Sequence, residues 1–390
     1  MSQIPKTMRA IKLTAPGQFS VAEIPTPQVQ AGSVLIKVEA AMVQPQIRNI
    51  LNAVVPHFRL PYPVVPGSNA IGRVVEAGPD AVVLEKGQLV LISSSVRARD
   101  DPSVQVVWGV SAAGFGQRSE QLYAKVARNG SFAEYLLAPL ENTCVLDERR
   151  LLGGGLGYKV PELLHLSADA VSYAGLRSID LQAGERIIVT PATGFFSTSA
   201  VDVAVAMGAN VVAASRNGDY LTRLKTVHPE IETVQLTGTD FDADKKALAS
   251  FGPVDAVVDI SPPSATGSNN LAAAVATLRP YGRVSLLGGR MDPSIPISYM
   301  DVMWKSLKIQ GSLMYTREDQ LGVIKLVESG RLKLGKAGGH EVVASYPLDR
   351  LLDAADHADK ANKLGQLVCL EPRQGNSLGV GISPCTFGTW

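Results

Sequence analysis

The clearest pattern of apolar and polar positions lies in the stretch Gly184–Arg216, which reads GERIIVTPATGFFSTSAVDVAVAMGANVVAASR. Arg186–Thr190 is a short run rich in β-branched apolar residues, typical of a strand buried in a parallel sheet. Small and apolar residues then predict a helix through Met207, because a glycine follows at the position of a helix C-cap. Asn210–Ala214 reads as a second buried strand. The stretch therefore predicts one complete β-α-β unit.

The chain before about residue 150 predicts mostly short strands separated by Gly and Pro turn signals. This pattern favours an all-β unit, a partly open barrel. The predicted strands are Arg9–Leu13, Ser20–Glu23, Val34–Ala40, Ala70–Glu76, Leu89–Ser93 and Phe132–Leu137. A polar stretch, Arg97–Gly130, interrupts them and predicts a long loop with one short helix at Ser119–Ala127. Loops of this length are usually functional lids or mobile excursions, and the sequence favours neither.

From about Leu163 the pattern changes to alternating strands and helices, which is typical of a parallel, doubly wound sheet. The predicted helices are Ser167–Leu181, Asp219–Thr226, Asp242–Ser250 and Asn269–Leu278, and the further strands are Thr233–Leu236, Val254–Ile260, Arg283–Leu287 and Leu307–Gly311. Ligands of such sheets bind outside the carboxyl ends of the strands. A last strand is predicted at Val368–Leu370, and the Gly/Ser-rich tail Arg373–Trp390 reads as an appendage.

The turn after the first strand of the β-α-β unit predicts a dinucleotide site. Backbone N–H groups point outward at a helix N-terminus there, which is a geometry that binds pyrophosphate. Gly194 is the only glycine of the turn, so an ordinary strand-turn-helix remains an alternative. Ser215 and Arg216 stand where an NAD site has an acidic residue, and they favour the 2′-phosphate of NADP(H). The predicted cofactor contacts are Thr193, Gly194, Phe195, Phe196, Ser197, Ser215, Arg216, Tyr220, Ile260, Ser261, Leu287, Gly288 and Gly289.

Composition narrows the class of protein. The 390 residues suggest two domains, and a net charge of +1 without a basic stripe argues against nucleic-acid binding. Three cysteines are too few for a disulfide framework and fit a reduced compartment. The first residues, MSQIPKTMRA, lack the apolar core of a secretory signal, and no apolar run reaches the length of a membrane span. We therefore expect a cytoplasmic protein with a small-molecule substrate and no membrane partner.

Several segments, in order, carry a resemblance to a known family. They read SVLIKVEAAMVQPQI, PGSNAIGRVVEAG, GSFAEYLLAP, VSYAGL, LQAGERIIVTPATG, YGRVSLLGG and KLGQLVCLEP. In this order they resemble the medium-chain dehydrogenase/reductase superfamily, on its zinc-free quinone and enoyl reductase side. The resemblance implies an α/β protein with a GroES-like barrel over residues 1–164 and 314–390 and a Rossmann domain over 165–313. It also implies a homo-oligomer, a homodimer or homotetramer, joined through the sheet edge at Ile295–Gly311.

The departures from this family bear on the metal. Zinc alcohol dehydrogenases of the superfamily have His-Glu after the Pro-Gly pair, whereas Ser68 and Asn69 follow Pro66-Gly67 here. The strand end where a zinc-ligating cysteine would stand reads Ala41–Gln44. No closely spaced set of four cysteines is available for a structural zinc. We therefore expect no metal.

The resemblance does not carry over a catalytic proton donor. Related zinc-free reductases often carry Asn-Pro-x-Asp where this chain has Gln44-Pro45-Gln46-Ile47, which keeps an amide and loses the acid. Gln44 is predicted to orient a substrate carbonyl or the nicotinamide amide. The candidate proton donors are Arg48, His57, Tyr62 and Tyr315, and the predicted catalytic set is Gln44, Tyr62 and His57.

The sequence thus predicts a metal-free, NADPH-dependent oxidoreductase that reduces an activated C=C bond in an enone, enoyl thioester or quinone. Two alternatives stay open. One is carbonyl reduction on the same scaffold, and the other is a nucleotide-binding protein with non-redox chemistry or no turnover.

Overall fold

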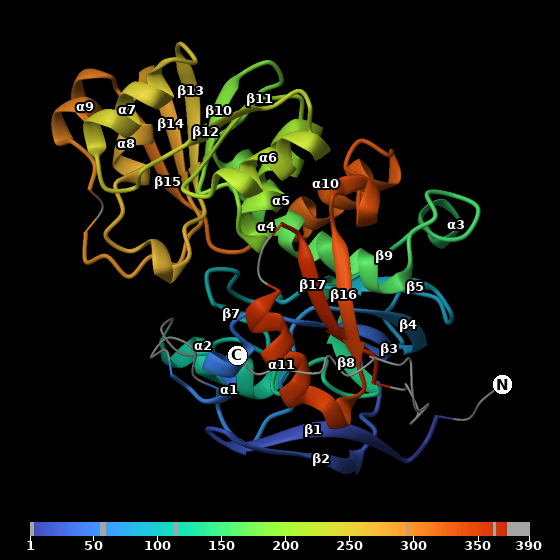
Figure 1. The fold of residues 1–390 in the computed structure, drawn as a ribbon. Coiled ribbons are helices and arrows are strands. Elements are labelled where there is room, and N and C mark those ends of the chain that lie inside the picture. Colours follow the sequence, from blue (N-terminus) through green and yellow to red (C-terminus); the bar gives the residue numbers. More distant parts are fainter. Residues whose placement is uncertain (1–3, 55–59, 113–115, 295, 362–363, 373–390) are drawn as a thin grey trace, which may run out of the picture.

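The structure is a computed structural model that describes residues 4–54, 60–112, 116–294, 296–361 and 364–372. His57, Ile295 and the tail Arg373–Trp390 lie outside these ranges. Figure 1 shows two lobes, one around a six-stranded sheet and the other around a seven-stranded sheet. No helix in the described ranges is long and apolar enough to cross a membrane.

The six-stranded sheet follows from the buried apolar runs of the second half of the chain. Its strands are β10 (Arg186–Thr190), β11 (Asn210–Ser215), β12 (Glu232–Gln235), β13 (Val254–Asp259), β14 (Leu278–Leu286) and β15 (Lys308–Gly311). Their order is β12-β11-β10-β13-β14-β15, and every neighbouring pair is parallel. The winding reverses between β10 and β13, so a ligand crevice is expected at their carboxyl ends. The predicted doubly wound sheet is confirmed.

Alternate residues of β10 feed two separate cores. Ile187 and Val189 pack with α4 (Leu166–Ser178) and α5 (Phe195–Ala206) on one face. Ile188 packs with α7 (Phe241–Ala249) and α8 (Asn270–Ala276) on the other. A strand buried on both faces needs an unbroken apolar run, which is why the sequence predicted β10 so clearly. Two more helices border the first core, α6 (Gly218–Val227) and α10 (Arg317–Glu328).

The other lobe is the expected barrel built from both ends of the chain. Its sheet contains β3 (Ser33–Val43), β4 (Ala70–Ala77), β5 (Leu89–Ile92), β8 (Tyr135–Pro139), β9 (Thr143–Val145), β16 (Glu341–Tyr346) and β17 (Gln366–Leu370). The chain returns from the six-stranded sheet to pair β17 antiparallel with β3. Around this sheet lie the hairpin of β1 (Thr7–Ala15) and β2 (Gln18–Pro25) and the helices α1 (Ile47–Leu51), α3 (Glu148–Leu151) and α11 (Leu351–Lys360).

Two predicted strand starts need correction, and one helix was missed. The strand expected from Phe132 begins at Tyr135, because Phe132 lies in the preceding loop and its N–H donates to the carbonyl of Pro66. The strand expected from Arg283 begins at Leu278, although Pro280 and Gly282 read as a break. Helix α9 (Tyr299–Trp304) was not predicted, because none of its residues is buried and it carries no core-facing pattern.

The described residues of the polar segment Arg97–Gly130 are packed into the barrel instead of forming the expected long loop, whereas the short helix expected at Ser119–Ala127 is present. It contains β7 (Gln105–Val107), paired with β6 (Ser95–Arg97), and α2 (Gln117–Val126). Trp108 and Tyr123 have 0% exposure in the barrel core. A few large buried side chains hold a segment whose average composition is polar.

Candidate functional site

The predicted dinucleotide turn lies between β10 and α5 and is tied to the end of β11. Gly194 is the N-cap residue of α5. The hydroxyls of Thr193 and Ser215 lie 2.7 Å apart, which joins two adjacent strand ends. Phe195 and Ser197 are buried, whereas Phe196 and Thr193 are partly exposed. The outward surface of the turn is thus made by Thr193, Phe196 and the first N–H groups of α5.

Arg216 follows directly at the exposed end of β11. Its side chain is exposed and makes no ion pair with a carboxylate of the described residues, while its carbonyl accepts from Gln235. Tyr220 lies on the first turn of α6 and is partly buried, with the guanidinium of Arg223 over its ring at 5.8 Å. The positive charge of Arg216 is therefore available to an anionic ligand at this edge.

The ends of β13 and β14 form a close backbone contact beside this turn. A Cβ added to Gly288 would lie 2.6 Å from the carbonyl oxygen of Ser261, so only glycine fits there. Ser261 is fully buried, and its hydroxyl donates to Asp259 at 2.5 Å. Burial raises the pKa of Asp259, although this hydrogen bond and the charge of Arg290 lower it.

The remaining predicted contacts at these strand ends differ in exposure. Ile260 is buried, and Leu287 is partly buried against Gly175 of α4. The N–H of Gly289 donates to the carbonyl of Ser261 at 2.8 Å. The side chains of Ile260 and Ser261 therefore point away from a ligand, and the backbone of Gly288 and Gly289 forms the exposed edge.

Gln44 lies at the start of a polar chain of contacts in the barrel lobe. Its Nε2 donates to the hydroxyl of Ser68 at 3.1 Å. The adjacent Asn69 is buried, and its Oδ1 accepts from the backbone N–H of Ser94 and from the hydroxyl of Tyr315, each at 3.1 Å. The ring of Tyr315 packs against Ala170 and Ala174 of α4 in the other lobe. This group thus lies where the two lobes meet.

The other predicted donors do not join this group. The hydroxyl of Tyr62 is buried without a partner among the described residues, and burial raises its pKa; the partly buried ring packs against the barrel core. Arg48 pairs with Asp356 and Asp359 on α11. His57 lies outside the described residues, so its predicted role remains a prediction.

Sequence reasoning noted Asn69 only as a missing zinc ligand, and it passed over Ser94 entirely. An amide at a position where the family has a carboxylate is the signal that could have identified Asn69. Ser94 carried no such signal, because its part is played by a backbone N–H that any residue has.

The thiols and imidazoles of the described chain do not form a metal site. No group of three or more His, Cys, Asp or Glu side chains within the described ranges is arranged to hold a metal ion. Cys144 donates to Gln320 at 3.3 Å, and Cys369 lies 3.1 Å from the hydroxyl of Ser345. Both thiols are buried, which raises their pKa.

A network of buried acids and imidazoles lies behind the dinucleotide turn. Asp202 of α5 contacts His228 at 2.6 Å and His340 at 3.0 Å, the latter as an ion pair without hydrogen-bond alignment. Burial opposes the charge on His340, but attraction to Asp202 raises its pKa above the ordinary value. The same contacts hold the pKa of Asp202 below its usual range despite burial.

Two further groups connect this network to the turn. The ring of His165 lies 4.4 Å from that of His340 and 5.8 Å from that of Phe195. Burial, followed by the charge of His340, holds the pKa of His165 well below its usual range. Asp169 accepts from Ser199 at 2.7 Å, and burial raises its pKa to about 7. The residues behind the dinucleotide turn are therefore ionisable groups, which contact Phe195 and α5.

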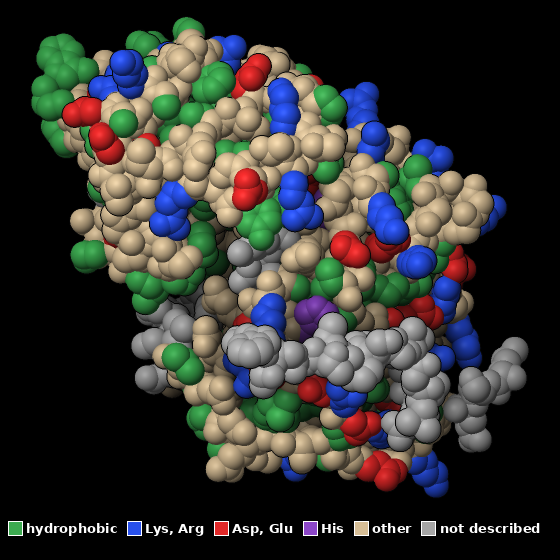
Figure 2. All heavy atoms as spheres, viewed as in Figure 1, with side chains coloured by type: hydrophobic (Ala, Val, Ile, Leu, Met, Phe, Trp, Pro, Cys, Tyr) green, Lys and Arg blue, Asp and Glu red, His purple; other side chains and the backbone are tan. Residues whose placement is uncertain are grey.

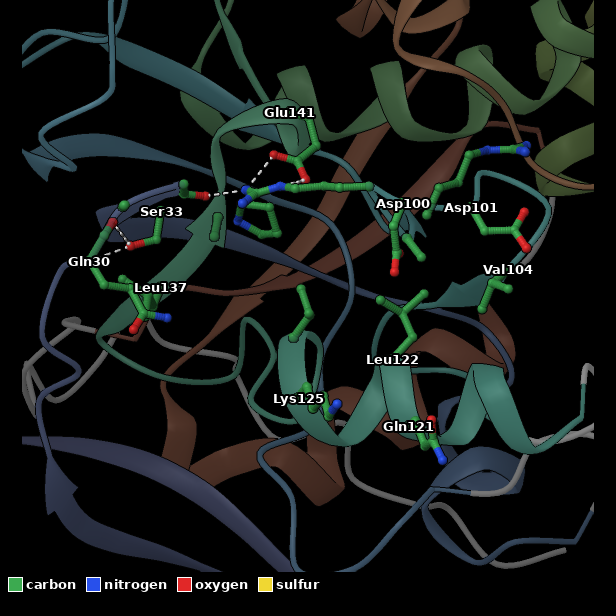
Figure 3. A pocket seen from close by; sticks show the side chains of 18 of the residues that line it. Gln30, Ser33, Asp100, Asp101, Val104, Gln121, Leu122, Lys125, Leu137 and Glu141 are labelled. Atoms are coloured by element: carbon green, nitrogen blue, oxygen red, sulfur yellow. Dashed lines mark hydrogen bonds and ion pairs between the residues drawn. The ribbon is translucent and has the colours of Figure 1, made fainter.

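A hollow with a volume of about 530 Å³ lies elsewhere, on the barrel lobe beside α2 (Figure 3). Its charged side chains largely pair with one another, since Arg99 forms two bonds to Glu141 and Arg118 lies 3.6 Å from Asp101. It contains none of the predicted site residues. We therefore place the candidate site at the strand ends and the lobe junction, not in this hollow.

Two family models match the chain. The alcohol dehydrogenase GroES-like domain matches residues 30–148, and the zinc-binding dehydrogenase model matches residues 197–329. The first covers part of the barrel, and the second covers the chain from the first turn of α5 to the end of α10. Both matches follow the two lobes of the structure.

Individual relatives match over nearly their whole length. The chain is 26% identical over 367 residues to the acryloyl-coenzyme A reductase of Sulfurisphaera tokodaii, which covers 93% of this chain and 99% of that protein. It is 24% identical over 381 residues to an NAD-dependent alcohol dehydrogenase of Saccharolobus solfataricus, with 93% and 100% covered. A solved structure of a candidate zinc-binding dehydrogenase from Sinorhizobium meliloti 1021, bound to NADP, has a TM-score of 0.71 at 19% identity, covering 94% of this chain and 100% of that one.

Proposed function

The chain belongs to the medium-chain dehydrogenase/reductase superfamily, and we propose that it is a metal-free, NADPH-dependent oxidoreductase that reduces an activated C=C bond. The substrate would be an enone, an enoyl thioester or a quinone. The similarity to an acryloyl-coenzyme A reductase supports this class. The observation that carries the proposal is the make-up of the site, in which hydroxyls and amides meet at Gln44, Ser68, Asn69 and Tyr315.

The described residues fit an NADP(H) molecule. The lack of a Cβ at Gly288 lets the ends of β13 and β14 approach closely, and the exposed backbone of Gly288 and Gly289 is the surface that a flat ring would contact. The unpaired charge of Arg216 suits the 2′-phosphate, and the outward N–H groups of the turn suit the pyrophosphate. The NADP-bound structural relative supports the same choice, whereas the NAD-dependent relative favours the other dinucleotide.

The bound nicotinamide would supply the hydride, and the residues of the chain would hold the substrate oxygen as negative charge develops on it. Because Ser68 Oγ accepts from Gln44, its own O–H is free to donate to that oxygen. Gln44 then acts as the residue that orients Ser68. Neutral donors of this kind suffice for conjugate addition more readily than for reduction of an isolated ketone, since the developing enolate is delocalised.

Metal independence is part of the proposal and has its own test. The residues at the family's zinc positions, Ala41–Gln44, Ser68 and Asn69, offer no thiolate, imidazole or carboxylate. We expect elemental analysis of purified protein to find far less than one zinc per chain, with activity unaffected by chelators. A stoichiometric, tightly held zinc would contradict this expectation, and the zinc-binding dehydrogenase model that matches residues 197–329 makes the measurement necessary.

The reaction is tested with a matched pair of substrates, a conjugated enone and the corresponding saturated ketone. We expect purified protein with NADPH to yield a product that is saturated at the C=C bond and retains its carbonyl, as read by mass spectrometry. Gln44→Leu removes the amide at similar volume and is expected to lower the rate by up to about 10²-fold, because Ser68 loses the partner that directs its O–H toward the substrate oxygen. Gln46→Leu, two residues along the chain, is the matched control.

The same experiment decides between the alternatives. Alcohol formed from the saturated ketone, with the C=C bond of the enone intact, would favour a carbonyl reductase, which the similarity to an alcohol dehydrogenase supports. Tight NADPH binding without turnover of either substrate would favour a non-redox protein. The domain bounds, 1–164 with 314–390 and 165–313, and the cytoplasmic location remain part of the proposal.

A further inference from the structure

We propose that the side-chain amide of Asn69 donates a hydrogen bond to the substrate oxygen, and that Tyr315 is the positioning residue that fixes the direction of this amide. The inference rests on the proposed function and deepens it. It names a second donor beside Ser68 and restricts substrates to those whose reacting C=C bond is conjugated to an oxygen that gains charge.

The orientation of Asn69 follows from its two partners. A backbone N–H can only donate, so the atom facing Ser94 N at 3.1 Å must be the carbonyl oxygen Oδ1 and not the nitrogen. The hydroxyl of Tyr315 donates to the same Oδ1 at 3.1 Å. Both acceptor positions of Oδ1 are thereby used. Rotating the amide by 180° would place its NH₂ group against the N–H of Ser94, so that two donors would face each other without an acceptor. The donor end, Nδ2, is left for another partner.

No described residue supplies that partner. Nδ2 of Asn69 forms no hydrogen bond within the described part of the chain. It is also not one of the fully buried side-chain atoms there that lack a hydrogen-bond partner, so part of its surface is accessible. It is therefore open to solvent or a ligand, although the residue as a whole is 4% exposed. The amide is therefore fixed by its oxygen, and its N–H groups can donate to a ligand.

The amide is held from both lobes. In the barrel, the N–H of Met42 donates to the carbonyl of Asn69 at 3.1 Å, and the N–H of Trp108 donates to the carbonyl of Ser94 at 2.8 Å. From the other lobe, the ring of Tyr315 rests on α4 while its hydroxyl reaches Asn69. Donors fixed before reaction stabilise developing charge without reorganising, and this is the property that gives them a large effect on rate.

The chemistry of the group selects the acceptor. A carboxylate at this position could only accept, whereas the amide accepts from Ser94 and Tyr315 and still donates. Ser68, next in the chain, has its O–H free because Gln44 donates to its oxygen. The N–H groups of Asn69 Nδ2 and the O–H of Ser68 are thus the neutral donors that this loop offers to a carbonyl oxygen that becomes an enolate.

The decisive variant is Asn69→Asp, which keeps an oxygen for Ser94 and Tyr315 and replaces the donor nitrogen by an acceptor. We expect kcat for the enone to fall by about 10²–10³-fold at pH 8, with NADPH affinity and thermal midpoint close to those of the unmodified protein. Because a protonated carboxyl regains a donor, activity of this variant should rise as the pH is lowered, whereas the unmodified protein shows no such rise. Asn129→Asp, an exposed asparagine, is the matched control.

Tyr315→Phe tests the positioning role. It removes the hydroxyl and keeps the ring on α4, and we expect kcat to fall about 10-fold with little change in KM, while the pH profile keeps its shape. Unchanged kcat in both Asn69→Asp and Tyr315→Phe would overturn the inference and leave the proposed function standing. Absence of enone turnover in unmodified protein that binds NADPH would overturn the proposed function and this inference with it.

Discussion

Arg216 is the residue on which the choice of dinucleotide depends in the proposed function. Its guanidinium is exposed and unpaired with the described carboxylates at the end of β11. Charge-assisted hydrogen bonds contribute about 1.5–3 kcal/mol. We therefore expect Arg216→Ala to weaken NADPH binding by about 10- to 150-fold in a fluorescence titration, with little change for NADH. Arg331→Ala, at another exposed arginine, should change neither. Equal affinities for both dinucleotides in the unmodified protein would contradict the assignment.

Asp202 is the residue on which the buried network behind the turn depends. It faces His228 and His340 directly, and Asp169, His165 and Glu230 complete the titratable groups around them. The folded pKa of each contacting imidazole is raised, so the stability from its charge is present below about pH 6.5 and is lost as the pH rises through the raised value. The folded pKa of Asp202 is lowered, so its contribution is lost only as the pH falls through that value.

Asp202→Asn should therefore destabilise the protein most near pH 6. Removing one partner of a buried ion pair costs about 3–5 kcal/mol, and we expect a loss of this size in urea unfolding at pH 6. The difference from the unmodified protein should shrink toward pH 9, as the pH rises through the raised pKa of the imidazoles and their charge is lost. Asp100→Asn, at an exposed carboxylate, is the control. The same loss at both pH values would show that the ionic contacts do not stabilise the fold.

The candidate site could be predicted only in part at this scale. Gln44 was found because its amide stands in a short motif, and the hydroxyl of Ser68 indeed contacts it. Tyr62 was chosen for its chemistry, but its hydroxyl is enclosed in the barrel core. The contact between Asn69 and Tyr315 joins positions 246 residues apart, and no local pattern reports such a distance.

At the scale of elements, prediction succeeded where burial is two-sided and failed where it is sparse. The strands β10 and β11 contain unbroken apolar runs, Ile187–Val189 and Val211–Ala214, since side chains on both faces enter a core. The segment Arg97–Gly130 is polar on average, and its packing depends on a few residues such as Trp108. The average polarity of the segment does not reveal a few large buried side chains such as Trp108, which is why a packed segment resembled a loop in the sequence.

This packed segment also positions the site. The backbone of Gly130 and Gly109 presses on Gly67, because a Cβ on either would lie 2.0 or 2.1 Å from the carbonyl oxygen of Gly67. The N–H of Ser131 donates to that oxygen at 3.2 Å. The loop that carries Ser68 and Asn69 is therefore clamped by the segment that the sequence indicated as a lid or an excursion.

At the scale of the whole molecule, the two lobes share the candidate site. The chain crosses from β15 to α10 through Tyr315, whose ring and hydroxyl contact different lobes. In the proposed function, the strand ends of the six-stranded sheet would supply the dinucleotide contacts, and the barrel would supply Gln44, Ser68 and Asn69. A change in the packing of the lobes would thus alter the substrate groups before it altered the dinucleotide turn.

The free edge of the six-stranded sheet supports the proposed homo-oligomer. All four residues of β15 are exposed, and an exposed edge strand offers unpaired backbone groups to a second strand. Apolar side chains gather around it, with Trp304 73%, Tyr299 77% and Ile309 38% exposed. Figure 2 shows hydrophobic side chains at this end of the molecule, where Figure 1 places α9. A second copy of the chain would cover this surface and extend the sheet across a twofold axis.

We expect sedimentation analysis to find a dimer of the unmodified protein at concentrations on the order of 10 µM, a range typical of stable interfaces of this kind. Trp304→Glu combined with Ile309→Lys should yield a monomer, because charges would be buried without partners at the joined edge. Val82→Lys, at an apolar residue that is 93% exposed on the other lobe, should leave the dimer intact. Circular dichroism distinguishes dissociation from unfolding, since a folded monomer retains its spectrum. A monomeric unmodified protein, or a dimer that persists with both edge substitutions, would exclude β15 as the interface and leave the exposed aromatic residues of α9 without a role.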